Sequence, residues 1–139
     1  MDRAIRNRIE HSFASQSMMT TFGAKLTHIA WDSVHITAPI LPGSLQQQGF
    51  GHAGLTFSIG DSAAGYAALS TLSLENEVVT AEMKINLLAP ARGDYLIAKG
   101  RVLKPGRRLV VVACDVFACS GAQEILIAAL QGTMVPVAV

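Results

Sequence analysis

The sequence has little charge, few aromatic side chains and almost no cysteine. Charged residues make up 15% and aromatic residues 6% of its 139 positions, and the formal net charge is +1. A chain so close to neutral gives no reason to expect nucleic acid or a membrane surface as a partner. It contains no run of about eighteen apolar residues, and its first ten residues carry several charges, so we expect neither a membrane span nor a signal peptide.

The only two cysteines, Cys114 and Cys119, are five positions apart in a strand-like segment. This odd spacing puts their side chains on opposite faces of a regular strand, which argues against a disulfide between them. No second Cys or His pair follows at a spacing that suits zinc. We therefore expect two buried free thiols, as in a protein of the reducing cytoplasm.

Hydrophobic residues, in contrast, make up 50% of the chain. The length predicts one domain over residues 1–139, long enough to bury a core. A short chain this apolar tends to have more hydrophobic surface than one subunit can cover. We therefore expect a homo-oligomer.

Hydrophobic periodicity predicts a short helix, two strands, a long helix and four more strands. The corresponding segments are residues 3–13, 24–31, 33–40, 52–72, 78–88, 95–103, 108–119 and 124–137. A polar connector, which could contain a helical turn at Met18 and Met19, covers 15–21. Short turns between consecutive strands imply an antiparallel sheet. The long helix is apolar on nearly all sides, so we expect it at the centre of an α+β fold, packed against that sheet.

Asp61 is the only Asp, Glu, Lys or Arg between Ser33 and Leu74. It lies in the middle of the predicted central helix, where a carboxylate is costly unless it is stabilised or used chemically. Such an acid could be a nucleophile or a general base. It could equally be a structural acid paired with a buried arginine, or lie on an exposed face of the helix.

A glycine-spaced turn that contains a histidine, GFGHAG over residues 49–54, precedes this helix. The first amides of a helix, here those of Ala53, Gly54 and Leu55, have no partners within it. Together with the helix dipole they form a site for an anion or for a carbonyl that gains negative charge. The simpler interpretation is a helix start that needs glycine for its turn.

The spacing between these two features has a geometric consequence. Asp61 follows Ala53 by eight residues, which is roughly 12 Å along a helix. The two groups therefore cannot act on one carbonyl from the same helix. If both are catalytic, the acid must come from a second subunit, and two helices related by a two-fold axis would give two equivalent sites per dimer.

Four segments together suggest a family. They are GFGHAG (49–54), DSA (61–63), TAEMKINLLAPARGD (80–94) and VLKPGR (102–107). In this order and spacing, they make residues 46–116 similar to the PaaI-like acyl-CoA thioesterases of the hotdog-fold superfamily. The match is specific for the family and not for a substrate.

The resemblance implies a long helix wrapped by an antiparallel sheet, in dimers whose sheets join and which often pair into tetramers. It also implies hydrolysis of an acyl-CoA thioester to free acid and CoA, without a metal or redox cofactor. By position, the Ala53 amide would polarise the thioester carbonyl, and Asp61 from the other subunit would be the nucleophile or general base. Thr80 would orient water near the acid, His52 would shape the turn, and Gly54 would lie beside the substrate.

Two departures from the family pattern concern this site. The commonest form has two glycines after the histidine, where this chain has Ala53 first; the role of a backbone amide survives this change. Some relatives have an asparagine six residues before the histidine that contacts the thioester, and here that position is Gln46. Its neighbours Gln47 and Gln48 could substitute for it.

A basic cluster lies around a predicted hairpin tip. Its members Lys104, Arg107 and Arg108 could contact the phosphates of CoA. The alternative is an ordinary solvated turn.

Two other functions fit the same sequence. A hotdog dehydratase or hydratase acting on acyl thioesters would use a histidine together with the helix acid, but His52 precedes the helix. A non-catalytic acyl-CoA-binding module would bind the same ligand without turnover, whether or not Asp61 is present.

Overall fold

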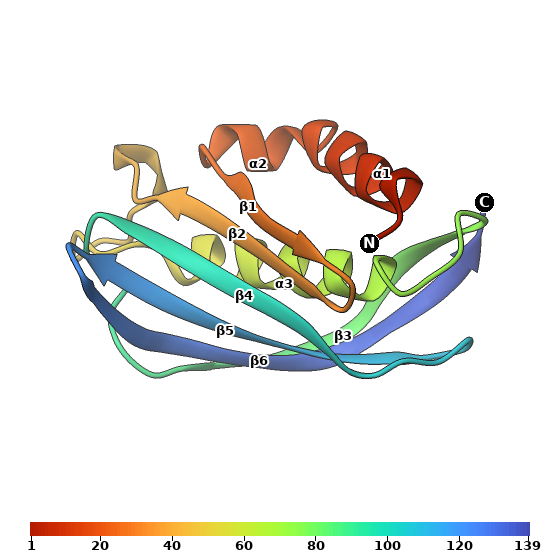
Figure 1. The fold of residues 1–139 in the computed structure, drawn as a ribbon. Helices are drawn as coiled ribbons and strands as arrows, with labels where there is room; N and C mark the ends of the chain where they lie inside the picture. The colour runs from red at the N-terminus through yellow and green to blue at the C-terminus, as the bar shows by residue number, and fades with distance from the viewer.

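The computed structural model describes residues 1–139 and contains three α-helices, one 3-10 helix and six strands (Figure 1). In chain order they are α1 (Arg3–Ala14), α2 (Ser17–Thr21), β1 (Lys25–Ala30), β2 (Ser33–Pro39), η1 (Pro42–Ser44), α3 (Ala53–Leu69), β3 (Asn76–Leu87), β4 (Tyr95–Lys104), β5 (Val110–Ser120) and β6 (Gln123–Ala138). The helix α2 lies inside the predicted polar connector, where the sequence had indicated no more than a helical turn at Met18 and Met19.

The six strands form a single sheet in the order β1-β2-β4-β5-β6-β3, and every neighbouring pair is antiparallel. The sheet curves around α3, while α1 and α2 lie together beside β1 (Figure 1). This confirms the predicted α+β hotdog fold, with a long central helix wrapped by a curved antiparallel sheet and a short N-terminal helix.

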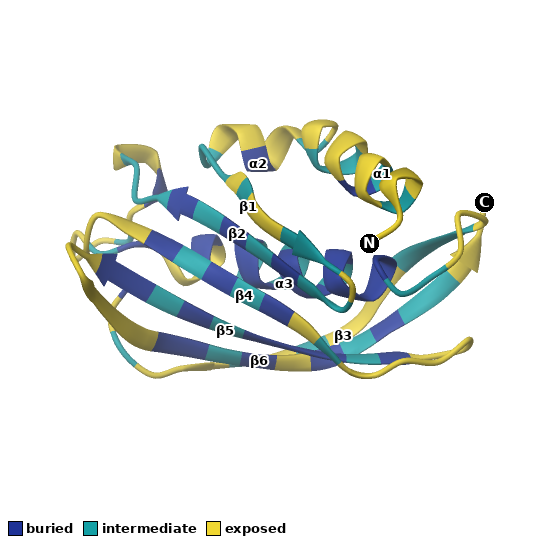
Figure 2. Ribbon diagram, in the orientation of Figure 1, coloured by how far each residue is buried: buried dark blue, intermediate teal, exposed yellow.

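The central helix α3 is buried over most of its surface (Figure 2). Small residues let it approach the sheet closely, because a Cβ on Gly100 of β4 would overlap the backbone of Ala63. A Cβ on Gly60 would lie 2.8 Å from Leu130 Cδ2 of β6. The pairing of glycine and alanine across the helix and sheet therefore sets how near the helix backbone comes to the strands.

Arg8 attaches the N-terminal helix to the end of α3. Its Nη1 donates to the carbonyls of Ser73 and Asn76, each at 2.8 Å, and its Nη2 donates to those of Leu69 at 3.0 Å and Leu72 at 3.3 Å. These are carbonyls in and after the last turn of a helix, where a cation is favourable. One guanidinium thus holds α1 against the segment that joins α3 to β3.

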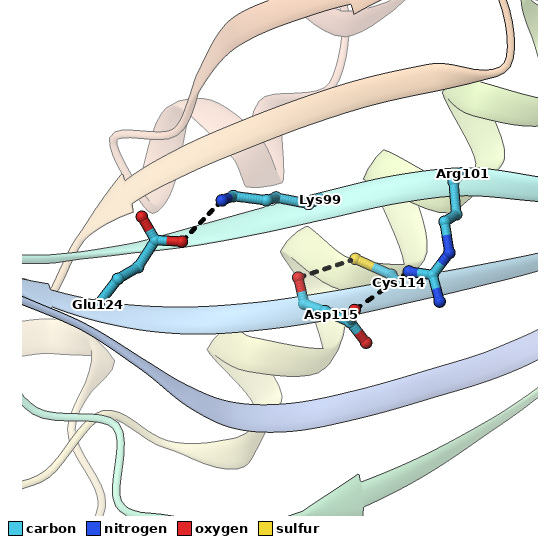
Figure 3. A network of polar contacts seen from close by, with 5 residues as sticks. All are labelled: Lys99, Arg101, Cys114, Asp115 and Glu124. Carbon is cyan, nitrogen blue, oxygen red and sulfur yellow. Dashed lines mark hydrogen bonds and ion pairs between the residues drawn. The ribbon is translucent and has the colours of Figure 1, made fainter.

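Both cysteines are buried and free, as predicted. The Cys114 thiol contacts the Asp115 carbonyl at 3.7 Å, and burial raises the pKa of this thiol well above its ordinary value. Nearby, on the outer face of the sheet, Lys99 pairs with Glu124 at 2.6 Å, and the Arg101 side chain pairs with the Asp115 carboxylate (Figure 3). These ion pairs are partly solvated, so we assign each about 1 kcal/mol or less.

One edge of the sheet is the long strand β3, which pairs only with β6. Three large apolar side chains on or next to it are about half exposed in the single chain: Val79 (51%), Leu87 (58%) and Leu88 (55%). A long edge strand with exposed apolar side chains is a typical surface for pairing with another chain. No helix in the structure combines the length and apolar character needed to cross a membrane.

Candidate functional site

Asp61 lies on the one stripe of α3 that is not buried. Every residue of α3 is buried except Ala53, Gly54, Phe57, Ser58, Asp61, Ser62 and Gly65. These residues recur at three- and four-residue spacing, so they form a single face of the helix. The acid and the helix start therefore share an open face of one buried helix.

Thr80 on β3 holds the Asp61 carboxylate in place. Its hydroxyl donates to Asp61 Oδ1 at 2.8 Å and also lies 3.3 Å from Met134 Sδ. Burial raises the pKa of Asp61, because it disfavours the charged form, and the hydrogen bond from Thr80 opposes part of that rise. An oriented, half-buried carboxylate with a raised pKa is suited to accept a proton or to attack an electrophile.

His52 is the N-cap of α3, and its ring has a specific partner. Its Nδ1 accepts a hydrogen bond from the Gly54 amide at 2.7 Å, and its carbonyl accepts one from the Leu55 amide at 3.0 Å. Two of the three amides that we expected to face a ligand at this helix start, those of Gly54 and Leu55, are therefore bonded to the N-cap residue. Only the Ala53 amide remains without a partner.

The three glutamines form a turn next to this helix start. The Gln46 side-chain oxygen accepts hydrogen bonds from the backbone amides of Gln48 and Phe50, the latter at 3.3 Å, while Gln46 Nε2 lies 3.2 Å from Gln48 Oε1. Gln46 therefore organises its own loop. A cavity of about 320 Å³ opens here, lined by Gln46, Gln47, Gln48, His52 and Ala53 among others.

A second cavity, of about 300 Å³, contains Asp61 and Thr80. None of the residues that line the first cavity lines this one. Within one chain, the predicted catalytic residues thus fall into two groups, one at the start of α3 and one at its middle, as the helical rise requires.

The basic hairpin lies apart from the helix start. Lys104 and Arg107 line a surface hollow with Arg108 at the tip between β4 and β5. The turn before α3 lies near the beginning of β4, because the Gly51 amide donates to the Ala91 carbonyl at 2.7 Å and β4 begins four residues after Ala91. Lys104, in contrast, is the last residue of β4. The length of that ten-residue strand, roughly 30 Å, separates the two features within one chain.

The sequence reasoning missed three polar residues at the Asp61 cavity. Ser12 and Gln16, from the N-terminal helical segment, and Tyr66 of α3 all line it. They are distant in sequence and belong to no motif, so only the tertiary contacts reveal them. No three His, Cys, Asp or Glu side chains are grouped in a way that could hold a metal ion.

Comparison with known proteins identifies the family. The family model described as "Thioesterase superfamily" matches residues 48–125. A putative esterase, SSO1253, from Saccharolobus solfataricus is 42% identical over 84 residues, which cover 60% of this chain and 53% of that protein. The matched region thus spans about half the length of this curated relative.

Solved structures agree over nearly the whole chain. A thioesterase family protein from Silicibacter pomeroyi superimposes with a TM-score of 0.94 at 35% identity, covering 97% of this chain and 99% of that one. The PaaI protein of the Escherichia coli phenylacetic acid degradation operon superimposes with a TM-score of 0.86 at 19% identity, covering 96% and 93%, and so shares the fold. The chain therefore belongs to the thioesterase superfamily and has the hotdog fold.

Proposed function

We propose that this protein hydrolyses acyl-CoA thioesters to the free acid and CoA, with Asp61 and the Ala53 amide as the reacting groups. The observation that carries the proposal is the open stripe of α3. It holds one oriented carboxylate and one unpartnered backbone amide, and the rest of the helix is buried.

In this reaction the Ala53 amide donates to the thioester carbonyl oxygen. Its hydrogen bond and the positive end of the α3 dipole stabilise the oxyanion as negative charge develops there. Asp61 then acts either as the nucleophile or as the base that deprotonates water. In either route the C–S bond breaks as a C–O bond forms, and the CoA thiolate takes up a proton. Attack by water gives the free acid directly, whereas attack by Asp61 gives an acyl anhydride that water then hydrolyses to the acid and the free carboxylate.

The two groups meet when two chains associate. Phe57 lies midway between Ala53 and Asp61 along the helix, so a two-fold axis beside Phe57 brings Ala53 of each antiparallel helix level with Asp61 of the other. Packed helices lie about 8–10 Å apart, a gap that a thioester and the Asp61 side chain can span. Pairing of the β3 edges about the same axis would join the two sheets and cover the exposed apolar side chains of β3.

The remaining predicted residues take supporting roles in this proposal. His52 caps Gly54 and so leaves the Ala53 amide as the donor to the substrate. The glutamine turn lines the approach to the thioester while Gln46 holds the loop. Gln47 can contact the thioester, and so can the Nε2 of Gln48, whose Oε1 already accepts from Gln46. Lys104 and Arg107 bind CoA phosphates; their replacement by alanine should raise KM more than it lowers kcat.

The proposal extends to the setting of the enzyme. In this proposal, residues 1–139 form one domain, and the active enzyme is a dimer or a dimer of dimers. The enzyme requires no metal or redox cofactor, since a carboxylate and an amide supply the chemistry. Two buried reduced thiols, Cys114 and Cys119, fit a cytoplasmic location.

The direct test is release of free CoA from a panel of short, medium, long and aromatic acyl-CoAs, run beside the Asp61→Asn protein. We expect turnover of at least one class and a loss on the order of a thousandfold in the variant. Saturable binding without turnover by the folded wild type would replace the proposal with an acyl-CoA-binding module. Hydration of an enoyl-CoA in place of hydrolysis would replace it with a hydratase.

A further inference from the structure

Part of the lining of the Asp61 cavity consists of hydrogen-bonding side chains, which lie beside the apolar Leu69, Val78 and Met134. The Tyr66 hydroxyl lies 3.1 Å from Ser12 Oγ and accepts a hydrogen bond from Gln16 Nε2 at 2.7 Å. Ser62 Oγ lies 3.5 Å from Gln16 Oε1. All four residues line the same cavity as the catalytic acid. A pocket for a plain alkyl chain would instead be lined here by apolar side chains.

Packing holds this polar part of the lining in place. Tyr66 is only 6% exposed, and the ring of Phe13 meets its ring edge-on, with centroids 6.2 Å apart. Gln16 is the N-cap of α2 but makes no capping hydrogen bond with its side chain. Its amide group is therefore committed to the cavity and not to the helix.

The cluster also has unused hydrogen-bonding capacity. Gln16 Nε2 carries a second N–H beyond the one given to Tyr66, and the Gln16 oxygen has only the long contact with Ser62. A ligand hydroxyl that donates to Gln16 Oε1 and accepts from Gln16 Nε2 would complete both groups. An alkyl end would displace water from them without replacing its hydrogen bonds, which costs affinity.

The charges around the cavity select against an anion. Asp61 and Glu77 both line it, and no lysine or arginine does. A second carboxylate on the substrate would meet these two like charges. Arg8 is the cation near Glu77, but it does not line the cavity, and its Nη1 and Nη2 donate to four backbone carbonyls. The group that fits is therefore neutral.

Helix geometry sets where that group lies along the acyl chain. Tyr66 follows Asp61 by five residues, which is roughly 7.5 Å along the helix axis. An extended chain advances roughly 1.2 Å per bond, since three backbone bonds span about 3.6 Å. About six bonds therefore separate the thioester carbon at Asp61 from a group at the Tyr66 end.

We propose that the preferred substrates are acyl-CoAs with a neutral hydroxyl about six bonds from the thioester carbon, selected by the Ser12, Gln16 and Tyr66 cluster. This proposal rests on the acyl-CoA hydrolysis proposed above. It assigns the N-terminal helical segment, which supplies two of the three side chains, a direct part in substrate choice.

The experiment compares three acyl-CoAs of equal length: hexanoyl-CoA, 6-hydroxyhexanoyl-CoA and adipoyl-CoA. We expect kcat/KM for the hydroxy substrate to exceed that for hexanoyl-CoA by about tenfold or more, with adipoyl-CoA the poorest. In Tyr66→Phe and in Gln16→Met the ratio of hydroxy to plain substrate should fall toward one. The exposed tyrosine provides the matched control, because Tyr95→Phe should keep the wild-type ratio.

The possible outcomes distinguish a failure of this substrate preference from a failure of the proposed acyl-CoA hydrolysis. Equal turnover of hexanoyl-CoA and 6-hydroxyhexanoyl-CoA, or a preference for adipoyl-CoA, overturns the assignment of the cluster and leaves acyl-CoA hydrolysis standing. A ratio that stays at its wild-type value in folded Tyr66→Phe and Gln16→Met also overturns it. Absence of hydrolysis across all acyl-CoAs overturns both.

Discussion

Replacement of Ala53 by proline would remove one hydrogen and little else. Ala53 is the first residue of α3, a position that proline favours because its missing N–H makes no bond within the helix. The preceding residue, His52, already has φ −65° and ψ 144°, the extended conformation that a following proline requires. The carbonyl and the ring of His52 remain free to cap the amides of Leu55 and Gly54.

The expected loss follows from the number of donors removed. The Ala53 amide is the one amide at this helix start without a partner, so Ala53→Pro deletes one oxyanion donor. Loss of one such donor costs about 10²–10³ in kcat, or about 2.7–4 kcal/mol. The Ala53→Gly protein is the control, because it loses the methyl group and keeps the N–H, and its kcat should stay within about threefold of the wild type.

Steady-state release of CoA, with thermal unfolding measured on the same samples, provides the assay. Ala53→Pro should unfold at a temperature close to that of the wild type, while its kcat falls by about 10²–10³. A folded Ala53→Pro protein with kcat within about threefold of the wild type would refute the role of this amide.

Three further predictions concern the supporting contacts. In Thr80→Val the Asp61 carboxylate loses a hydrogen bond that lowers its pKa, so the acid limb of the pH–rate profile should move to higher pH; a move to lower pH would contradict this. Burial raises the pKa of Asp61, so the fold loses stability as the pH rises and this buried carboxyl group ionises. Asp61→Asn should therefore unfold at neutral pH at the same temperature as the wild type or higher. The difference in unfolding temperature should shrink in acid, where Asp61 is protonated. Arg8→Ala removes four hydrogen bonds from a cation to carbonyls, so urea unfolding should show the free energy of unfolding reduced by about 2–4 kcal/mol. Arg6→Ala on the same helix is the control, because the only ion pair of Arg6 is the exposed one with Glu10, and it should lose about 1 kcal/mol or less. Equal losses in the two variants would argue against the docking role of Arg8.

Much of the fold is encoded in local pattern. The strand β2 alternates apolar and polar residues between clear turn residues, and α3 is a long apolar segment that begins at a capped turn. Their positions could therefore be predicted to within a few residues. The five-residue α2 is too short to show such a period, so the sequence indicated a connector with at most a helical turn there.

Some features of the candidate site could likewise be predicted from the sequence, and others depend on tertiary contacts. The isolation of Asp61 in an apolar segment and its distance from Ala53 are properties of the sequence and of helix geometry. The capping of Gly54 depends on the rotamer of His52, which no residue pattern specifies. The contacts of Tyr66 with Ser12 and Gln16 join residues about fifty positions apart, so they exist only once α1 has docked on α3.

The central claim is that each site takes the Ala53 amide from one chain and Asp61 from the other. It is tested by co-expressing Ala53→Pro and Asp61→Asn chains with different affinity tags and purifying the mixed dimer. Both homodimers should be inactive, while the mixed dimer contains one intact site of two and should have about half of the wild-type activity. A mixed dimer as inactive as its parents, together with half activity when the wild type pairs with the double variant, would place both groups in one chain and contradict the account.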